Sequence, residues 1–168
     1  MSHPMVDQVR FARSEFVRSL EGVTNEEAIQ RFGSMNSIGW IIGHMANQEQ
    51  RFWFERRGES ILIPELDDLV GFGKPASTPP LDEMWSAWRT ITDASNPFLD
   101  TLTTDDLQTF YTANGVPSPD SVGTMMMRQI DHYWFHNGEA QAIRQLLGHI
   151  NLPQFVGNIG QEAPYRPE

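Results

Sequence analysis

The chain has 168 residues, with 22 acidic against 12 basic side chains, a formal net charge of -10 and no cysteine. The basic residues form no stripe that could neutralise a phosphate backbone, which argues against nucleic-acid binding, and no stretch approaches the ~20 apolar residues of a membrane span. Without thiols there are no disulfides and no thiolate ligands, so a metal ion would have to bind His, Asp, Glu, Asn, Gln or water.

The first part of the chain carries two long helical patterns. Apolar residues recur at helical spacing from about residue 4 to 21, which predicts an amphipathic helix. Thr24 and Glu27 have the form of a capping box and predict a short connecting helix. A second long helix is predicted from its N-cap, Ser37, to Gly58.

Two further long helices are predicted with irregular connections between them. The segment 58–80 is rich in proline and glycine, so we expect a long loop there with no regular element of any length. Helical spacing returns over residues 81–102, with a kink or interruption expected before Pro97. The segment 103–120 is expected to form turns.

The fourth long helix is predicted to begin after Ser121 and to end at Gly148, with an irregular tail over residues 149–168. Neither an alternating strand pattern nor an internal repeat is found. Four amphipathic helices therefore predict an all-α four-helix bundle that forms a single domain over residues 1–168. The composition predicts a cytoplasmic protein.

Three of the 5 histidines are predicted to face the core. His132 and His136 fall within an arc of roughly 60° with apolar residues of the last helix, and their i, i+4 spacing lets two imidazoles converge on one ion. His44 lies at the edge of the apolar face of the second long helix. The three could hold a divalent ion and leave coordination positions open. His3 and His149 lie outside these faces and are given no role.

The same side chains have a simpler interpretation as hydrogen-bonded core residues without a metal ion. Gln48 and Gln129, each within a turn of a proposed ligand, could support the ligands or be polar residues at the core edge. Glu139 could orient a ligand ring or act as a base, but an ordinary solvated helix charge is favoured. The aromatic residues near the histidines, such as Trp40 and Tyr133, are better explained as core.

Two segments resemble the motif helices of the DinB-like superfamily, which includes YfiT-type proteins and thiol-dependent transferases. They are SIGWIIGHMANQEQRFW and IDHYWFHNGEAQAIRQLLG. The resemblance covers most of the chain and depends on one His after an IGW-type helix start, followed by H-x-x-x-H and a Gly. It implies an up-down-down-up bundle, frequently dimeric, with a three-His site that takes zinc or nickel. The family's ligand positions match His44, His132 and His136.

The resemblance also implies a class of reaction. Relatives of this kind join low-molecular-weight thiols such as mycothiol, bacillithiol or glutathione to electrophiles. We therefore expect a metal-dependent transferase that takes its thiol from a cosubstrate, because the chain has no cysteine. The family commonly has Arg-Gly-Gln after the last His, whereas this chain has Asn137, Gly138 and Glu139, so the substrates stay open.

Two other functions remain open at this point. One is a non-catalytic, stress-related metal-binding bundle, and the other is a metal-dependent hydrolase that uses bound water. A carboxylate from the long loop, such as Glu65, Asp67 or Asp68, would close the site and favour the non-catalytic function. The family pattern has no such ligand, so we expect an open site. The resemblance and the apolar helix faces also predict a homodimer.

Overall fold

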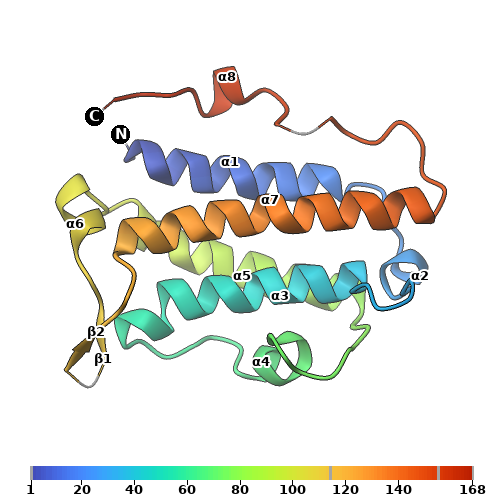
Figure 1. Ribbon diagram of the computed structural model, residues 1–168, viewed down its shortest axis with the longest axis horizontal. Coiled ribbons are helices and arrows are strands. Elements are labelled where there is room, and N and C mark those ends of the chain that lie inside the picture. Colours follow the sequence, from blue (N-terminus) through green and yellow to red (C-terminus); the bar gives the residue numbers. More distant parts are fainter. Residues whose placement is uncertain (1, 114, 155, 168) are drawn as a thin grey trace.

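The structure is a computed structural model that describes residues 2–113, 115–154 and 156–167, and it shows an all-α bundle of four long helices (Figure 1). These are α1 (Pro4–Ser19), α3 (Ile38–Trp53), α5 (Leu81–Leu99) and α7 (Val122–Leu146). Helices α1 and α7 run in one direction, and α3 and α5 run in the other (Figure 1). The predicted all-α bundle with up-down-down-up topology is therefore confirmed.

The helix ends follow the capping signals of the sequence. The hydroxyls of Ser37 and Ser121 accept hydrogen bonds from backbone amides at the starts of α3 and α7. The short helix α2 (Asn25–Ala28) has the predicted capping box. The predicted end of the second long helix at Gly58 was wrong, because α3 ends at Trp53. A 3-10 turn, η1 (Glu55–Arg57), follows and ends at Gly58, which has a left-handed conformation with φ of 79°.

The long loop contains a helix that the sequence analysis did not predict. Helix α4 (Glu65–Val70) occupies part of the segment that we expected to be irregular. Leu66 and Val70, four residues apart, are buried against the core, and acidic residues in the first turn suit the positive end of the helix dipole. Its length of 6 residues is too short to give a clear periodic signal, so its stability comes from this packing.

Three smaller expectations about secondary structure were also wrong. Helix α5 is continuous through Pro97, which lies in its last turn, where a missing N–H costs one hydrogen bond and does not break the helix. The segment expected to form turns holds α6 (Thr104–Gln108) and a small hairpin of β1 (Thr112–Ala113) and β2 (Val116–Pro117). Asn114, part of the predicted turn, lies outside the described residues. The tail contains α8 (Ile159–Glu162).

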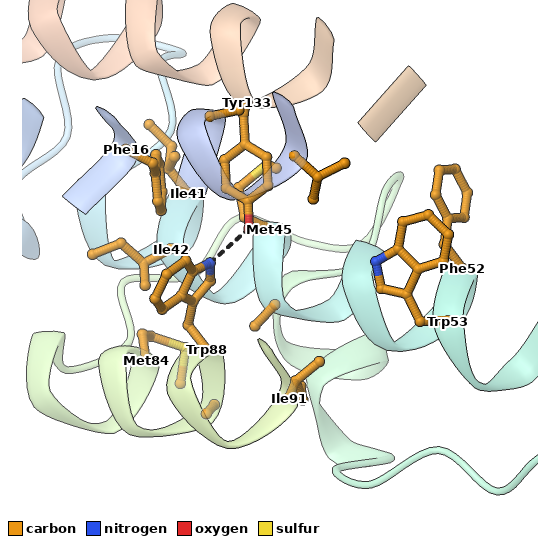
Figure 2. Packing of buried hydrophobic residues seen from close by; sticks show 14 of the residues in the cluster. Phe16, Ile41, Ile42, Met45, Phe52, Trp53, Met84, Trp88, Ile91 and Tyr133 are labelled. Carbon is orange, nitrogen blue, oxygen red and sulfur yellow. Dashed lines mark hydrogen bonds between the residues drawn. The ribbon is translucent and has the colours of Figure 1, made fainter. Parts of the chain in front are cut away.

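The core is formed by aromatic and aliphatic side chains from all four long helices (Figure 2). Helix α3 packs closely on its neighbours because it presents Gly39 and Gly43 to them. A Cβ atom on Gly39 would collide with the carbonyl oxygen of Pro79, and one on Gly43 would collide with the side chain of Met84. The same Cβ atom on Gly43 would also lie 3.2 Å from the side chain of Val70, so this close packing sets the position of α3, and so of His44, relative to both α5 and α4.

A buried ion pair links the helices inside this core. The guanidinium of Arg13 on α1 donates two hydrogen bonds, of 2.9 and 2.6 Å, to the carboxylate of Glu49 on α3. Tyr133 of α7 donates to the same carboxylate at 2.7 Å, and Trp88 of α5 donates to the Tyr133 hydroxyl at 2.9 Å (Figure 2). The four helices therefore share one hydrogen-bond network.

The C-terminal tail runs back along α1, and its last described residues lie near the start of that helix (Figure 1). Gln8 donates a hydrogen bond of 2.7 Å to the carbonyl of Ala163, and Arg166 pairs with Asp7.

In the described residues, no helix combines the length and the apolar character needed to cross a bilayer.

Candidate metal centre

The structure brings together the three histidines that the sequence singled out. His44 projects from α3, and His132 and His136 project from successive turns of α7, which lies antiparallel to α3. Each offers a ring nitrogen, and these nitrogens all lie within 4.8 Å of one another. The ring centroid of His44 lies 5.1 Å from that of His132 and 5.2 Å from that of His136. The group is therefore compact enough to hold a single metal ion.

The ring of His44 is held in one orientation by two neighbours. Its Nδ1 atom lies 2.9 Å from the carbonyl oxygen of Val70, the last residue of α4. Because a carbonyl can only accept, Nδ1 carries the proton and Nε2 keeps its lone pair. Trp40, one turn earlier on α3, stacks on the imidazole with centroids 4.4 Å apart and planes at 11°. Both contacts leave Nε2 available as a ligand.

The pair on α7 has a carboxylate behind it. Nε2 of His136 lies 2.9 Å from Nε2 of His132, so the two atoms point toward one another. Nδ1 of His136 lies 2.8 Å from Oε2 of Glu139, and Oε1 of Glu139 accepts a hydrogen bond of 3.0 Å from Asn36. A carboxylate behind an imidazole fixes its orientation and makes its other nitrogen a stronger ligand.

Burial keeps two of the rings neutral. Burial, together with a smaller effect of the neighbouring imidazoles, lowers the pKa of His44 to about 4 and the pKa of His132 to about 3. Burial alone would raise the pKa of Glu139, but hydrogen bonds from His136 and Asn36 and the charge of His136 together lower it. Neutral imidazoles beside an ionised carboxylate fit a borderline divalent ion, since metal ligands must be deprotonated.

The other candidate residues have different surroundings. Glu139 was expected to be a solvated charge, but its side chain is only 17% exposed and contacts His136, so that expectation was wrong. Gln48 is half-buried, whereas Gln129 is fully buried. Neither the nitrogen nor the oxygen of the Gln129 carboxamide has a hydrogen-bond partner in the described residues. Within the described residues, neither glutamine bonds to the three histidines. His149 joins Arg144 to Glu27, away from this site.

The acidic residues of the long loop form their contacts elsewhere. Asp67 accepts a hydrogen bond of 3.2 Å from Asn47, and Asp68 lies 2.7 Å from the ammonium of Lys74. Glu65 lies in the first turn of α4 and lines a separate cavity. Among the described residues, no carboxylate joins the three imidazoles in a group that could hold an ion. The coordination positions that the histidines leave are not filled by these acids.

A cavity of about 680 Å³ opens beside the histidines. His44 and His132 form part of its wall, so a small molecule inside it could reach both imidazoles. The rest of the wall combines aromatic and charged side chains with one carboxamide: Gln48, Phe52, Arg56, Phe72, Asp120, Arg128, Asp131 and Phe135. Its volume lies within the ~300 to 1,000 Å³ typical of ligand sites.

Several contributors to this site were missed by the sequence analysis. Trp40 was taken as a core residue, yet it is half-buried and stacks on His44. The Val70 carbonyl lies 26 positions from His44, and Asn36 lies 103 positions from its partner Glu139, so nothing in the local sequence pattern marks either contact. The IGW start of α3 was the available signal for Trp40, because it places that ring one turn before His44 on the same face.

Comparisons with other proteins concern the fold and the family of the chain. A crystal structure of a conserved protein from Enterococcus faecalis matches with a TM-score of 0.66 over 86% of this chain and 96% of that one. Its sequence identity is 14%, so the likeness shows the fold alone. No curated protein matches the chain. The sequence profile of the DinB superfamily matches residues 8–140, which include all three histidines. The chain therefore belongs to the DinB superfamily.

Proposed function

We propose that the protein is a metal-dependent transferase that uses a low-molecular-weight thiol as cosubstrate. The divalent ion, zinc or nickel, would be held by His44, His132 and His136. The observation that carries this proposal is that two of the three convergent imidazoles, His44 and His132, border a cavity of about 680 Å³ and that no described carboxylate completes the group. Such a site can bind a substrate, whereas a structural site has its four positions filled by protein ligands.

A bound ion would supply Lewis acidity, which lowers the pKa of a coordinated thiol or water. The chain's own residues prepare the site for this chemistry. Val70 and Glu139 orient His44 and His136 through their Nδ1 atoms. The thiol comes from the cosubstrate because the chain has no cysteine. In the reaction with 1-chloro-2,4-dinitrobenzene, the thiol loses its proton to solvent and its sulfur forms a bond to the ring carbon that carries chlorine. The bond from that carbon to chlorine breaks, and chloride leaves to solvent.

The experiment follows thiol binding and turnover in the same preparation. The protein is loaded with cobalt, titrated with glutathione, bacillithiol and mycothiol, and followed by its visible absorption, and conjugation to 1-chloro-2,4-dinitrobenzene is then assayed. We expect a spectral change with at least one thiol and turnover that is lost in His44→Ala. His149→Ala is the matched control, since His149 contacts Arg144 and Glu27 outside the site.

The outcomes separate the three functions. A protein that binds cobalt but responds to none of the thiols would contradict the transferase. Ester hydrolysis that depends on His44 would then favour the hydrolase. A metal-loaded protein that is inert in both assays and much more stable than the metal-free form would favour the non-catalytic bundle.

We also propose that the protein is a cytoplasmic homodimer, as the composition, the family habit and the apolar helix faces suggest. Met127 and Leu146 on α7 are 56% and 55% exposed, which leaves apolar surface for a partner. Light scattering at micromolar concentration should give twice the mass of the 19.2 kDa chain. The mass of a single chain would contradict the dimer.

A further inference from the structure

The cavity beside the histidines has an apolar part and a charged part. Three phenylalanine side chains, Phe52, Phe72 and Phe135, line it, and Phe72 and Phe135 are 90% and 69% exposed. Exposed aromatic rings around a cavity favour an apolar or aromatic ligand, because such rings gain from stacking and from burial. The charged side chains of the wall determine which charge on that ligand is favoured.

Arg56 differs from the other basic residues of the chain. The chain has 12 basic side chains. All of them except Arg56 form a hydrogen bond, an ion pair or a ring contact with another side chain or with the backbone in the described residues. In that part of the chain Arg56 has no such contact, and it lines the cavity. The one uncommitted cation of the described residues therefore faces the candidate site.

The absence of a partner for Arg56 has a local cause. Arg56 lies in the 3-10 turn η1, between two residues that are already paired. Glu55 pairs with Arg51 at 3.1 Å, and Arg57 pairs with Glu59 at 2.6 Å and lies over the ring of Phe98. The nearest acidic residues in sequence are thus used by other arginines, although the chain as a whole carries an excess of acids.

The charges of the cavity favour an anionic ligand. Arg128 and Asp120 lie 2.7 Å apart and offset one another, and Asp131 is the other acidic side chain of the wall. The four charged residues, including Arg56, sum to zero. A divalent ion on three neutral imidazoles adds two positive charges, of which the carboxylate of Glu139 behind His136 offsets one. A ligand that carries a negative group at the Arg56 side of the cavity is then attracted by the charge of Arg56 and by the charge of the ion.

We propose that the cavity binds a substrate with an apolar, aromatic body and a carboxylate group, and that Arg56 is the residue that recognises the carboxylate. This proposal rests on the proposed function, because it names the substrate class of the same site. The planar guanidinium of Arg56 matches a carboxylate through two parallel hydrogen bonds. The aromatic body lies against Phe52, Phe72 and Phe135.

The test uses probes without a thiol group. Binding of 3-phenylpropanoate and of its uncharged analogue 3-phenylpropanamide is measured by calorimetry, with the zinc-loaded protein and with the chelated protein. We expect the acid to bind at least ~10-fold more tightly than the amide in the loaded protein, as a charge-assisted bidentate pair predicts. In Arg56→Gln this preference should fall by about the same factor.

A matched variant controls for the change in net charge. Arg89 is also an exposed arginine, but it lines a different cavity and lies near the ring of Trp85. Arg89→Gln should therefore keep the full preference for the acid. Both substituted residues are exposed, so both variants should fold, and circular dichroism with thermal melting checks this.

Three results would overturn the proposal. The first is equal binding of acid and amide, the second is binding of neither probe, and the third is a preference that disappears on chelation but is unchanged in Arg56→Gln. The third result would show that the ion alone holds the carboxylate. Because the probes carry no thiol, the two tests are independent. Failure of the thiol titration would reject the transferase but not the carboxylate site at Arg56, and failure of the probe binding would reject the carboxylate site but not the transferase.

Discussion

Oε2 of Glu139 lies 2.8 Å from Nδ1 of His136, one turn earlier on α7. This contact places the carboxylate behind the imidazole and turns Nε2 of His136 toward Nε2 of His132. Asn36, in the turn before α3, holds the other carboxylate oxygen at 3.0 Å. Glu139 thus connects His136 to Asn36, in the segment before α3, which contributes no ligand itself.

Glu139→Ala should weaken metal binding by roughly 10- to 100-fold, because loss of a carboxylate behind a ligating imidazole has this effect in other metal sites. The ring of His136 would lose its fixed orientation, and its Nε2 would become a weaker donor. The zinc dissociation constant is measured by competition with a chromophoric chelator. Asn36→Ala is the control, since it leaves the contact between Glu139 and His136 in place and should have a smaller effect. An unchanged dissociation constant in Glu139→Ala would show that the contact does not support the metal.

The positions of the histidines could be predicted because their signal is local. The i, i+4 spacing of His132 and His136 puts both on one face of a helix, and the neighbouring apolar residues turn that face inward. The partners of these rings could not be predicted. Glu139 has the same local pattern as a solvated helix charge, and only the approach of Asn36 and the burial of His136 distinguish the two.

The fold shows the same division between local and tertiary information. The starts of α3 and α7 follow from Ser37 and Ser121, and the end of α7 follows from Gly148, all of which act within one or two turns. Helix α4 exists because Leu66 and Val70 pack against α3, a contact that is absent from the local sequence pattern. The carbonyl of Val70, its last residue, accepts a hydrogen bond from His44, so a contact of the candidate site comes from a helix that the local sequence did not predict.

The purified protein should contain about one divalent ion per chain, and His132→Ala should abolish this content. With His132 removed, two imidazoles remain, and two ligands hold an ion much less tightly than three. Elemental analysis of the wild type and of the three single histidine variants measures this. His149→Ala should keep the ion. A metal content that stays the same in all three single variants would place the ion elsewhere.

The metal-free protein should lose stability as the pH falls from 6.5 toward 4. In the unfolded chain His44 and His132 bind protons near pH 6.5, whereas burial in the folded protein lowers the pKa values to about 4 and about 3. The unfolded state then binds more protons across this range, so the free energy of unfolding decreases with falling pH, by at most about 1.4 kcal/mol per pH unit for each ring. Above pH 6.5 both rings are neutral in both states, and this dependence ends.

Urea unfolding of chelated protein at pH 7, 6 and 5 measures that dependence. His132→Gln removes one of the two titrating groups, so the free energy of unfolding should fall less steeply with decreasing pH than in the wild type. Comparing the slopes, and not the absolute stabilities, separates the titration from any loss of packing in the variant. Equal slopes in the two proteins would mean that the pKa of His132 in the folded protein is close to its value in the unfolded chain.

Glu49→Gln should destabilise the protein by about 3 to 5 kcal/mol, because it leaves the charge of Arg13 buried without its counterion. Arg13 is 5% exposed and Glu49 is fully buried, so solvent cannot replace the lost interaction. Tyr133 would also lose a charged acceptor, which weakens the contact from α7 to α3. Urea unfolding of zinc-loaded protein gives the free energy of unfolding for each variant.

A double-mutant cycle with Arg13→Met separates the ion pair from packing. Replacing both charges should cost less than the sum of the two single changes, since the double variant leaves no unpaired charge in the core. Full recovery is not expected. The Ser95 hydroxyl would lose the hydrogen bond from Arg13, and Gln at position 49 has one acceptor oxygen for the two donors Tyr133 and Trp53. A cost below about 1 kcal/mol for Glu49→Gln, or simple additivity in the cycle, would contradict a strongly coupled buried pair.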